Sequence, residues 1–306
     1  MTAWPPVALG CGNFGGVGSS PAFFGQGTDE PTASAIMDAA WDAGIRWFDT
    51  ADAYGGGRSE EWIGRWRAER AVDPMLTTKV FHSDVGDLSD TGLAPNRIRR
   101  RVERSLERLG VERIDLYLAH EPDPDTPRGD SVAAFERLVD EGVVGAWGLS
   151  NYDGGGIRAA LEHGRPAVVQ NKYSLLDRAD EADVLPLCAG HAIAYVPFGP
   201  LAGGWLTGKY RRGEPFPAGS RMTQRPEPYA HLVTDTVFDG VDRLQAEADA
   251  RGTTTAALAF AWVLSHPDVT GVVCGPNRPE HLDPVLAARG LDLTDDDRER
   301  IGAFFA

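Results

Sequence analysis

The chain has 306 residues, of which 42% are hydrophobic and 25% charged, and its formal net charge is -15 at pH 7. Such a composition is typical of a globular protein with one large α/β barrel or two smaller domains. The negative charge disfavours binding to nucleic acid phosphates and to an anionic membrane surface. The start of the chain lacks signal-peptide features, and the longest apolar run, Ala256 to Leu264, has nine residues, too few to span a bilayer. We therefore expect a cytoplasmic protein without a nucleic acid or membrane partner.

The three cysteines, Cys11, Cys188 and Cys274, stand among apolar or small residues. No pair of them has the spacing of metal ligands. We expect reduced thiols that pack in the core, and no metal site.

Eight short apolar runs are predicted to be strands. Their nearly continuous hydrophobicity is typical of parallel strands that are covered on both faces. The runs begin at Val7, Ile45, Met75, Ile114, Val144, Ala167, Ala192 and Gly271.

Helical patterns lie between these runs. Apolar residues recur every three or four positions from Ile98 to Leu109, and Gly110 follows as a helix stop. Similar patterns run from Val132 to Val139 and from Val241 to Ala248. Eight strands that alternate with helices predict a single (β/α)₈ barrel domain over residues 1–306 rather than an open sheet.

Three long irregular segments follow predicted strands: Gly15 to Glu30 after the first, His120 to Asp130 after the fourth and Lys209 to Asp235 after the seventh. On a barrel they would gather at the C-terminal face, where active sites are built. Long loops in a compact domain are usually functional or disordered. We therefore expect the functional site at this face.

Four residues near strand ends have side chains that could act together in catalysis: Asp49, Tyr54, Lys79 and His120. Taken singly, Asp49 is better explained as a helix cap or as an acceptor that fixes a loop, Tyr54 as a core or rim residue and His120 as a loop residue. A lysine that ends an apolar strand is harder to dismiss, because buried lysines tend to be functional. As a set, the four supply what proton-coupled carbonyl reduction needs.

The reduction of a carbonyl requires a hydride at carbon and a proton at oxygen. The pKa of a free tyrosine, ~10, is high for a general acid, and a lysine ammonium ~4 Å away would lower it by about three units. A buried Asp49 paired with Lys79 would keep that lysine charged. A neutral His120 would hydrogen-bond the substrate oxygen and orient it.

On these residues the chain resembles an aldo-keto reductase over essentially its whole length. The resemblance implies that Tyr54 donates the proton, that Lys79 and Asp49 tune it, and that His120 orients the carbonyl. It also implies that Asp49 adjoins the cofactor. The expected reaction is reversible reduction of an aldehyde or ketone to an alcohol.

Further motifs match those with which the family binds the nicotinamide and pyrophosphate ends of its cofactor. GLSN supplies Ser150 and Asn151, and VVQNKYSLLDR supplies Gln170, all matching residues that bind the carboxamide. Phe198 in PFGPLAGGWLTGKY falls where an aromatic ring, usually tyrosine, stacks on the nicotinamide. Backbone amides of a glycine-rich loop bind phosphate. The remaining residues that the resemblance assigns to the cofactor here are Asn13, Gly199, Pro200, Leu201, Gly203 and Lys209.

The C-terminal motif, VVCGPNRPEHLDPVLAA, departs from the family at two positions. His281 stands where Gln, Glu or Arg usually grips the adenosine ribose or its phosphate, and Val285 replaces an asparagine that commonly contacts adenine. The resemblance still assigns Gly275, Asn277, Arg278 and His281 to this end of the cofactor. NADP(H) is favoured, with NAD(H) not excluded.

Two further patterns are rejected as functional motifs. GCGNFG matches the dinucleotide fingerprint, but no helix is predicted to begin there, so its glycines would not meet a pyrophosphate. The arginine-rich stretch RIRRRVERSLER is interrupted by Glu103 and Glu107, and its apolar stripe assigns the arginines to a solvated helix face.

The substrate pocket is expected to include Phe14, Tyr54, Phe81 and His120, and to take a small carbonyl compound whose identity the sequence leaves open. The oligomeric state is open as well. One alternative is a regulatory or redox-sensing protein with slow turnover, as in channel β-subunits that resemble this family. A metal-dependent barrel hydrolase is disfavoured, because the seven histidines show no paired ligand spacing at strand ends.

Overall fold

The computed structural model describes residues 4–87 and 89–306. All eight predicted strands are present. They are β1 (Val7–Gly10), β2 (Trp47–Asp49), β3 (Met75–Val80), β4 (Ile114–Ala119), β5 (Val144–Ser150), β6 (Val168–Gln170), β7 (Ala194–Tyr195) and β8 (Val272–Cys274). The bounds of β3 and β5 coincide with the predicted apolar runs, and the other six strands are shorter than theirs.

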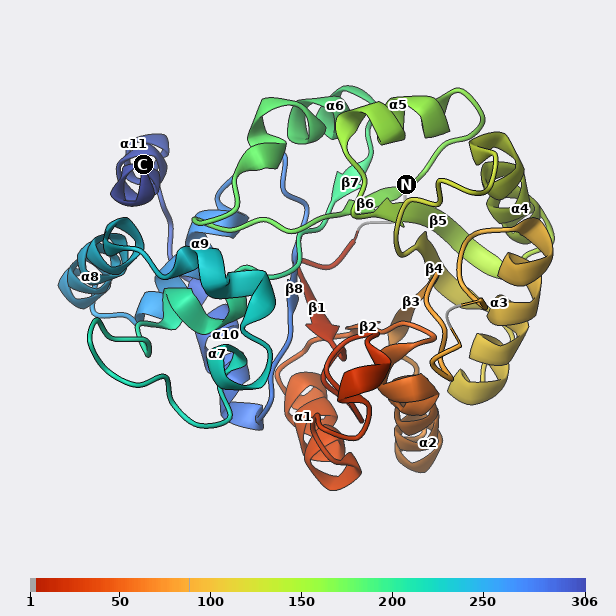
Figure 1. Ribbon diagram of the computed structural model, residues 1–306, viewed down its shortest axis with the longest axis horizontal. Helices are drawn as coiled ribbons and strands as arrows, with labels where there is room; N and C mark the ends of the chain where they lie inside the picture. The colour runs from red at the N-terminus through yellow and green to blue at the C-terminus, as the bar shows by residue number, and fades with distance from the viewer. Residues whose placement is uncertain (1–3, 88) are drawn as a thin grey trace.

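The strands form one curled parallel sheet in the order β7-β6-β5-β4-β3-β2-β1-β8. Its two end strands also meet, because the amides of Thr270 and Val273 each donate to a carbonyl oxygen near β7, those of Tyr195 and Pro197, at 2.9 Å. Figure 1 shows the helices outside this curled sheet. The arrangement is consistent with the (β/α)₈ fold predicted from the sequence.

The three helices predicted from apolar spacing are confirmed as α3, α4 and α8. Gly110 ends α3 with a φ of 65°, a left-handed conformation that glycine adopts without strain. The helices are α1 (Glu30–Asp42), α2 (Arg58–Arg70), α3 (Pro95–Leu109), α4 (Arg128–Asp140), α5 (Gly154–Leu161), α6 (Val184–Gly190), α7 (Arg221–Gln224), α8 (Asp235–Ala250), α9 (Thr255–Leu264), α10 (Asp283–Ala288) and α11 (Asp295–Gly302).

Strand side chains alternate between two apolar clusters. Trp47 belongs to the cluster enclosed by the sheet, whereas its neighbour Phe48 packs in the cluster between sheet and helices. The inner cluster also holds Ala8, Leu116, Leu118, Val168, Val196 and Val273. The three cysteines are buried and free, as predicted.

The arginines of α3 correct one prediction. Arg97 and Arg101 are buried, with 4% and 0% of their surface exposed, instead of lying on a solvated face. Arg101 contacts Asp52 at 2.7 Å and Asp84 at 2.5 Å. These carboxylates lie in the segments after β2 and β3, so the partners that make burial of Arg101 tolerable are distant in sequence.

Candidate active site

The period of two along each strand brings three of the four candidate residues to one place. Asp49 lies two positions after Trp47, and His120 lies two after Leu118, so both continue the inner face of the sheet at its C-terminal end. Lys79 is paired in register with Leu118 on the neighbouring strand.

Lys79 is the centre of the cluster. Its Nζ lies 2.5 Å from Asp49 Oδ1, 2.8 Å from the carbonyl oxygen of Thr50 and 3.5 Å from the Tyr54 hydroxyl. Lys79 and Asp49 are only 1% and 3% exposed. Burial alone would lower the pKa of Lys79, but Asp49 and Tyr54 outweigh that effect, so the pKa is raised and the ammonium is kept.

Tyr54 reaches Lys79 because a glycine-rich turn follows it. Gly55 and Gly56 have φ values of 60° and 73°. A Cβ on Gly55 would lie 2.4 Å from the carbonyl oxygen of Phe14, which leaves room only for glycine. The turn therefore fixes Tyr54 against the segment that follows β1.

The pKa of Tyr54 differs from the sequence-based expectation. Burial of the phenol raises its pKa, Lys79 lowers it and Asp49 raises it again, and the net direction is upward. The expected lowering by Lys79 is present but is outweighed by the burial of the phenol, to which the Asp49 carboxylate adds. The phenol therefore holds its proton at neutral pH.

His120 completes the cluster. Its Nε2 lies 3.5 Å from the Tyr54 hydroxyl, and the two rings meet edge to face with centroids 5.5 Å apart. Burial, Lys79 and His82 lower the pKa of His120 well below its ordinary value, so the imidazole is neutral. Its Nδ1 is buried with no partner among the described residues.

Residues predicted at the nicotinamide end lie beside this cluster. Gln170 Nε2 donates to Asp49 Oδ2 at 2.8 Å. Asn151 has a φ of 63°, and its side-chain amide donates to the carbonyl oxygen of His120 at 3.0 Å and contacts Ser150 Oγ at 3.3 Å. A non-glycine residue in this conformation is uncommon and often marks a functional site. Phe198 is partly buried against the inner cluster.

The segments after β7 and β8 carry a cluster of three cations, Lys209, Arg221 and Arg278. Burial, Arg221 and Arg278 lower the pKa of Lys209, so these side chains repel one another. Neither Lys209 nor Arg221 forms a salt bridge within residues 4–87 and 89–306. The Lys209 ammonium lies over Gly204, where a Cβ would be 2.6 Å from Nζ.

This cation cluster fits a dinucleotide. The positive charges of the exposed Lys209 and the partly buried Arg221 favour an anionic ligand, and the backbone amides of a glycine-rich turn such as the one beside them can bind phosphate. Gly199 and Gly203 bend this turn with φ values of 70° and 66°, Pro200 is buried and Leu201 is partly buried.

The C-terminal residues lie next to the first loop. Asn13 Nδ2 donates to Asn277 Oδ1 at 2.5 Å, and Arg221 donates to Asn13 Oδ1. Gly275 follows β8 and approaches the carbonyl oxygen of Gly10. Val285, the other departure from the family pattern, is completely buried and belongs to the core.

A cleft of about 400 Å³ opens beside these residues. It joins the segment after β1 to those after β7 and β8 and is lined by Asn13, Val17, Gln26, Gly27, Thr28, Asp29, Thr32, Gln224, Asn277 and Arg278. Three predicted cofactor residues are among them. The cleft thus lies beside the residues that the resemblance predicts at the adenosine end of the cofactor.

The predicted substrate wall is only partly accessible. Phe14 has no exposed surface and packs in the core, and its backbone forms a bridge with Thr28. Phe81 is partly buried, and its ring contacts that of His82 at 5.2 Å. We therefore leave Phe14 out of the substrate pocket.

Sequence reasoning missed three polar residues at the site. Arg221 joins the cation cluster, and its only signal was the arginine content of the long segment after the seventh strand. His82 and Glu121 stand beside His120, with His82 Nε2 3.8 Å from Glu121 Oε1. Both lie within three residues of predicted site residues in the chain, and that proximity was their only signal.

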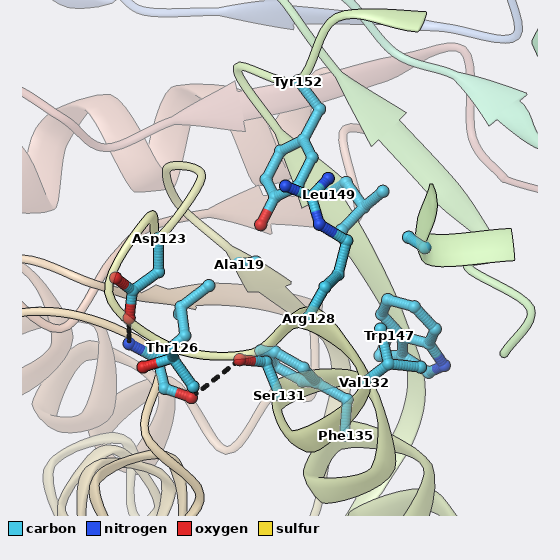
Figure 2. Close-up of a pocket in the computed structure, with 12 residues that line it drawn as sticks. Ala119, Asp123, Thr126, Arg128, Ser131, Val132, Phe135, Trp147, Leu149 and Tyr152 are labelled. Carbon is cyan, nitrogen blue, oxygen red and sulfur yellow. Dashed lines mark hydrogen bonds between the residues drawn. The ribbon is translucent and has the colours of Figure 1, made fainter. Parts of the chain in front are cut away.

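A second cavity lies away from this chemistry, between α4 and the ends of β4 and β5 (Figure 2). Its volume is about 10 Å³, roughly enough for one water molecule. Around it Asp123 accepts from the amide of Leu93 at 2.6 Å, and Ser131 donates to the carbonyl oxygen of Leu93 at 3.0 Å. The cavity is too small for a carbonyl substrate.

The described part of the chain shows neither a metal cluster nor a membrane-spanning helix. No group of three or more His, Cys, Asp or Glu residues there is arranged to hold a metal ion. No helix in residues 4–87 and 89–306 is long and apolar enough to cross a membrane.

Comparison with known proteins places the chain in a family. A model of the Aldo/keto reductase family matches residues 6–305. A probable voltage-gated potassium channel subunit beta of Arabidopsis thaliana is 34% identical, covering 87% of this chain and 84% of the relative. The NADH-specific methylglyoxal reductase of Escherichia coli is 32% identical, covering 92% and 89%. The structure of a glycerol dehydrogenase from Gluconobacter oxydans superposes with a TM-score of 0.83 at 30% identity, covering 98% and 90%. The chain therefore belongs to the aldo/keto reductase family of oxidoreductases.

Proposed function

We propose that this chain is a single-domain NADP(H)-dependent reductase that converts a small aldehyde or ketone to an alcohol. The observation that carries the proposal is the contact of one buried ammonium, Lys79 Nζ, with both Asp49 and the Tyr54 hydroxyl, beside a neutral His120. Nothing in barrel packing requires this set of groups. Their common use is proton transfer at an oxygen.

In this mechanism the carbonyl oxygen lies between the Tyr54 hydroxyl and His120 Nε2. When bound, a nicotinamide cofactor would supply the hydride for the carbonyl carbon. Tyr54 then gives its proton to the oxygen, and Lys79 stabilises the phenolate that remains. Asp49 keeps Lys79 protonated, and His120 holds the carbonyl in line.

The cofactor would be held along the C-terminal face. Ser150, Asn151 and Gln170 are proposed to bind the carboxamide, and Phe198 to pack on the nicotinamide ring. The residues proposed for the pyrophosphate and adenosine ends are Asn13, Gly199, Pro200, Leu201, Gly203, Lys209, Arg221, Gly275, Asn277, Arg278 and His281. The positive charges of Lys209, Arg221 and Arg278 support NADP(H) over NAD(H), because the 2′-phosphate adds negative charge.

Titration with NADPH and NADH by fluorescence, followed by absorbance loss with nitrobenzaldehyde, tests the proposal. Tight NADPH binding with turnover is the expected result. Failure to bind either dinucleotide would contradict the cofactor assignment.

Tyr54→Phe is expected to abolish reduction while the Kd for NADPH stays within about twofold of wild type. The phenol oxygen acts in the chemical step and makes no contact needed to hold the cofactor, so kcat falls by at least the 10²–10⁴-fold typical of a lost general acid. Steady-state kinetics and the fluorescence titration measure the two effects separately. Unchanged turnover would remove Tyr54 from the role of acid.

A regulatory role is the second candidate, favoured by the 34% identity to a probable potassium channel β-subunit. Such a protein would bind the cofactor and turn over slowly. Multiple-turnover rates with several small aldehydes distinguish the two functions, since a regulatory protein would turn over slowly with all of them.

A further inference from the structure

The two segments that follow β3 and β4, residues 81–94 and 120–127, flank His120 on the side of the barrel opposite the cation cluster. In the closed sheet, β5 and β6 separate β4 from β7, and β1 and β2 separate β3 from β8. The two segments contain six acidic residues and no lysine or arginine. The C-terminal face is therefore positive where the cofactor is proposed to bind and negative beside His120.

Four of these six acids keep their charge without a counter-ion. Asp84 and Asp90 form salt bridges with arginines of α3. Within residues 4–87 and 89–306, the other four form no salt bridge with a lysine or an arginine: Asp87, Glu121, Asp123 and Asp125. Burial raises the pKa of Asp123, but hydrogen bonds from neighbouring backbone amides and a threonine lower it below its usual value, so this carboxylate is ionised.

Glu121 connects this negative region to the reacting groups. Its Oε1 accepts from Asn151 Nδ2 at 3.2 Å and lies 3.8 Å from His82 Nε2. The ring of His82 in turn meets that of His120 edge to face, with centroids 5.0 Å apart. Glu121 Oε2 has no hydrogen-bond partner in the described part of the chain, and 36% of the side chain is exposed. The carboxylate thus offers a free acceptor at the opening of the site.

The position of His120 indicates which part of a substrate would meet Glu121. The carbonyl oxygen is proposed to lie between the Tyr54 hydroxyl and His120 Nε2, whose separation of 3.5 Å is long for a hydrogen bond. The nicotinamide is proposed to occupy the side of β5, β6 and β7. The remainder of the substrate is then directed towards the partly buried His82 and Glu121, which follow β3 and β4.

Resting on the proposed function, we propose that Glu121 selects the substrate by charge. The chain reduces carbonyl compounds whose remainder carries a hydrogen-bond donor, a hydroxyl or an ammonium group, and rejects those whose remainder carries a carboxylate. An ionised carboxylate only accepts hydrogen bonds, and it binds hydroxyl and ammonium donors strongly. A carboxylate on the substrate would face an acceptor of the same charge, so it would be repelled and left without a donor.

Four benzaldehydes that differ only in their meta substituent test this selection. The substituents are a carboxylate, its methyl ester, a hydroxymethyl group and a dimethylaminomethyl group, which is cationic at a pH of about 8. At this pH an imidazole is ordinarily neutral, so histidines do not offset the charge of Glu121. With NADPH, the wild type is expected to show its lowest kcat/KM with the carboxylate, at least about fivefold below the ester, and its highest with the two donors.

Glu121→Gln removes the charge and keeps an acceptor for Asn151. Relative to the ester, kcat/KM of the variant should rise about three- to tenfold for the carboxylate and fall by a similar factor for the cation. Glu112→Gln is the matched control. It removes the same charge from an exposed residue just before β4, at the opposite end of the barrel, and should leave both ratios unchanged.

Equal ratios in wild type and Glu121→Gln would overturn the inference, and so would an equal change in Glu112→Gln or a wild-type preference for the carboxylate. A preference for the hydroxymethyl compound supports it with a hydroxyl as the donor, and a preference for the dimethylaminomethyl compound supports it with an ammonium. If nitrobenzaldehyde is reduced but the four ratios do not depend on Glu121, the proposed function stands and this inference fails. If NADPH drives no reduction of any of these aldehydes, both fail.

Discussion

A single lysine connects the acid, the carboxylate and the hydroxyl at this site. Lys79 Nζ donates to Asp49, to a backbone oxygen and to Tyr54, and almost none of its surface is exposed. Each of two buried opposite charges has lost its hydration, so the removal of either one leaves the other destabilised. The lysine is thus both a structural and a chemical residue.

Lys79→Met is expected to lower the free energy of unfolding by about 3–5 kcal/mol, because it leaves the Asp49 carboxylate buried without its counter-charge. Urea denaturation followed by circular dichroism measures this loss. The double variant Lys79→Met with Asp49→Asn removes both charges and should recover most of the stability but none of the activity. A single variant that unfolds like wild type and keeps its rate would refute the pairing argument.

At the residue scale, the sequence could identify those polar residues whose position in an apolar run indicates burial. Asp49 and Lys79 end apolar runs, so their burial could be expected from position alone. Arg101 and Phe14 could not be assigned in the same way. The burial of Arg101 depends on Asp52 and Asp84, which lie 49 and 17 residues away in the chain, and that of Phe14 accompanies a backbone bridge to Thr28.

At the level of elements, α3 is joined to the segment that carries Tyr54 by a buried ion network. Arg101 bridges Asp52 and Asp84, and Arg108 donates to the carbonyl oxygen of Asp52 at 3.0 Å. Asp84 also contacts Arg104 and Arg108, and its pKa falls to about 2 despite burial. Among the described residues, the Asp52 carboxylate forms a salt bridge with Arg101 alone, and its Oδ1 has no hydrogen-bond partner.

This imbalance makes Asp52 a source of pH-dependent stability. Burial raises the pKa of Asp52 from 3.8 to about 7, although Arg101 lowers it. The folded state therefore holds a proton that the unfolded state has lost, and stability from this group is lost as the pH rises through 7. Between pH 5 and pH 8 the loss amounts to about 2–3 kcal/mol.

Asp52→Asn should remove this dependence, because asparagine keeps an acceptor for Arg101 and does not ionise. From pH 5 to pH 8 the contribution of Asp52 to the free energy of unfolding falls by about 2–3 kcal/mol in wild type and is absent in the variant. The variant should therefore gain about 2–3 kcal/mol relative to wild type over this range. Urea midpoints at four pH values measure it, and the comparison cancels His120, whose lowered pKa acts in the opposite direction. A difference that is constant across this range would contradict the assignment.

The strands and helices could be predicted from the sequence more fully than the side-chain contacts between them. Eight strands and three helices were predicted because apolar periodicity is local. The α3 network was not, since it depends on which segments the barrel brings together. The same holds for the cation cluster of Lys209, Arg221 and Arg278, whose members are up to 69 residues apart in the chain.

Across the whole molecule, the segments after β1 and β7 meet over the proposed cofactor site. Arg221 donates to Asn13, and the Arg225 guanidinium lies 5.3 Å from the centre of the Phe23 ring. The cleft of about 400 Å³ is lined from both segments. A dinucleotide that enters beneath these contacts would have to part them, so binding should include a slow rearrangement.

Arg225→Ala is expected to speed the release of NADPH by about two- to fivefold, because an exposed cation–π contact contributes ~0.5–1 kcal/mol to the closed arrangement. Stopped-flow fluorescence should resolve a fast binding step and a slower isomerisation in the wild type, with the reverse of the slow step accelerated in the variant. Arg211→Ala is the matched control, since Arg211 lies on the same segment but makes only a 3.8 Å ion pair with Asp242. Wild-type traces with one fast step and no later phase would mean that the two segments do not close over the cofactor, and release would then be set by the cation cluster alone.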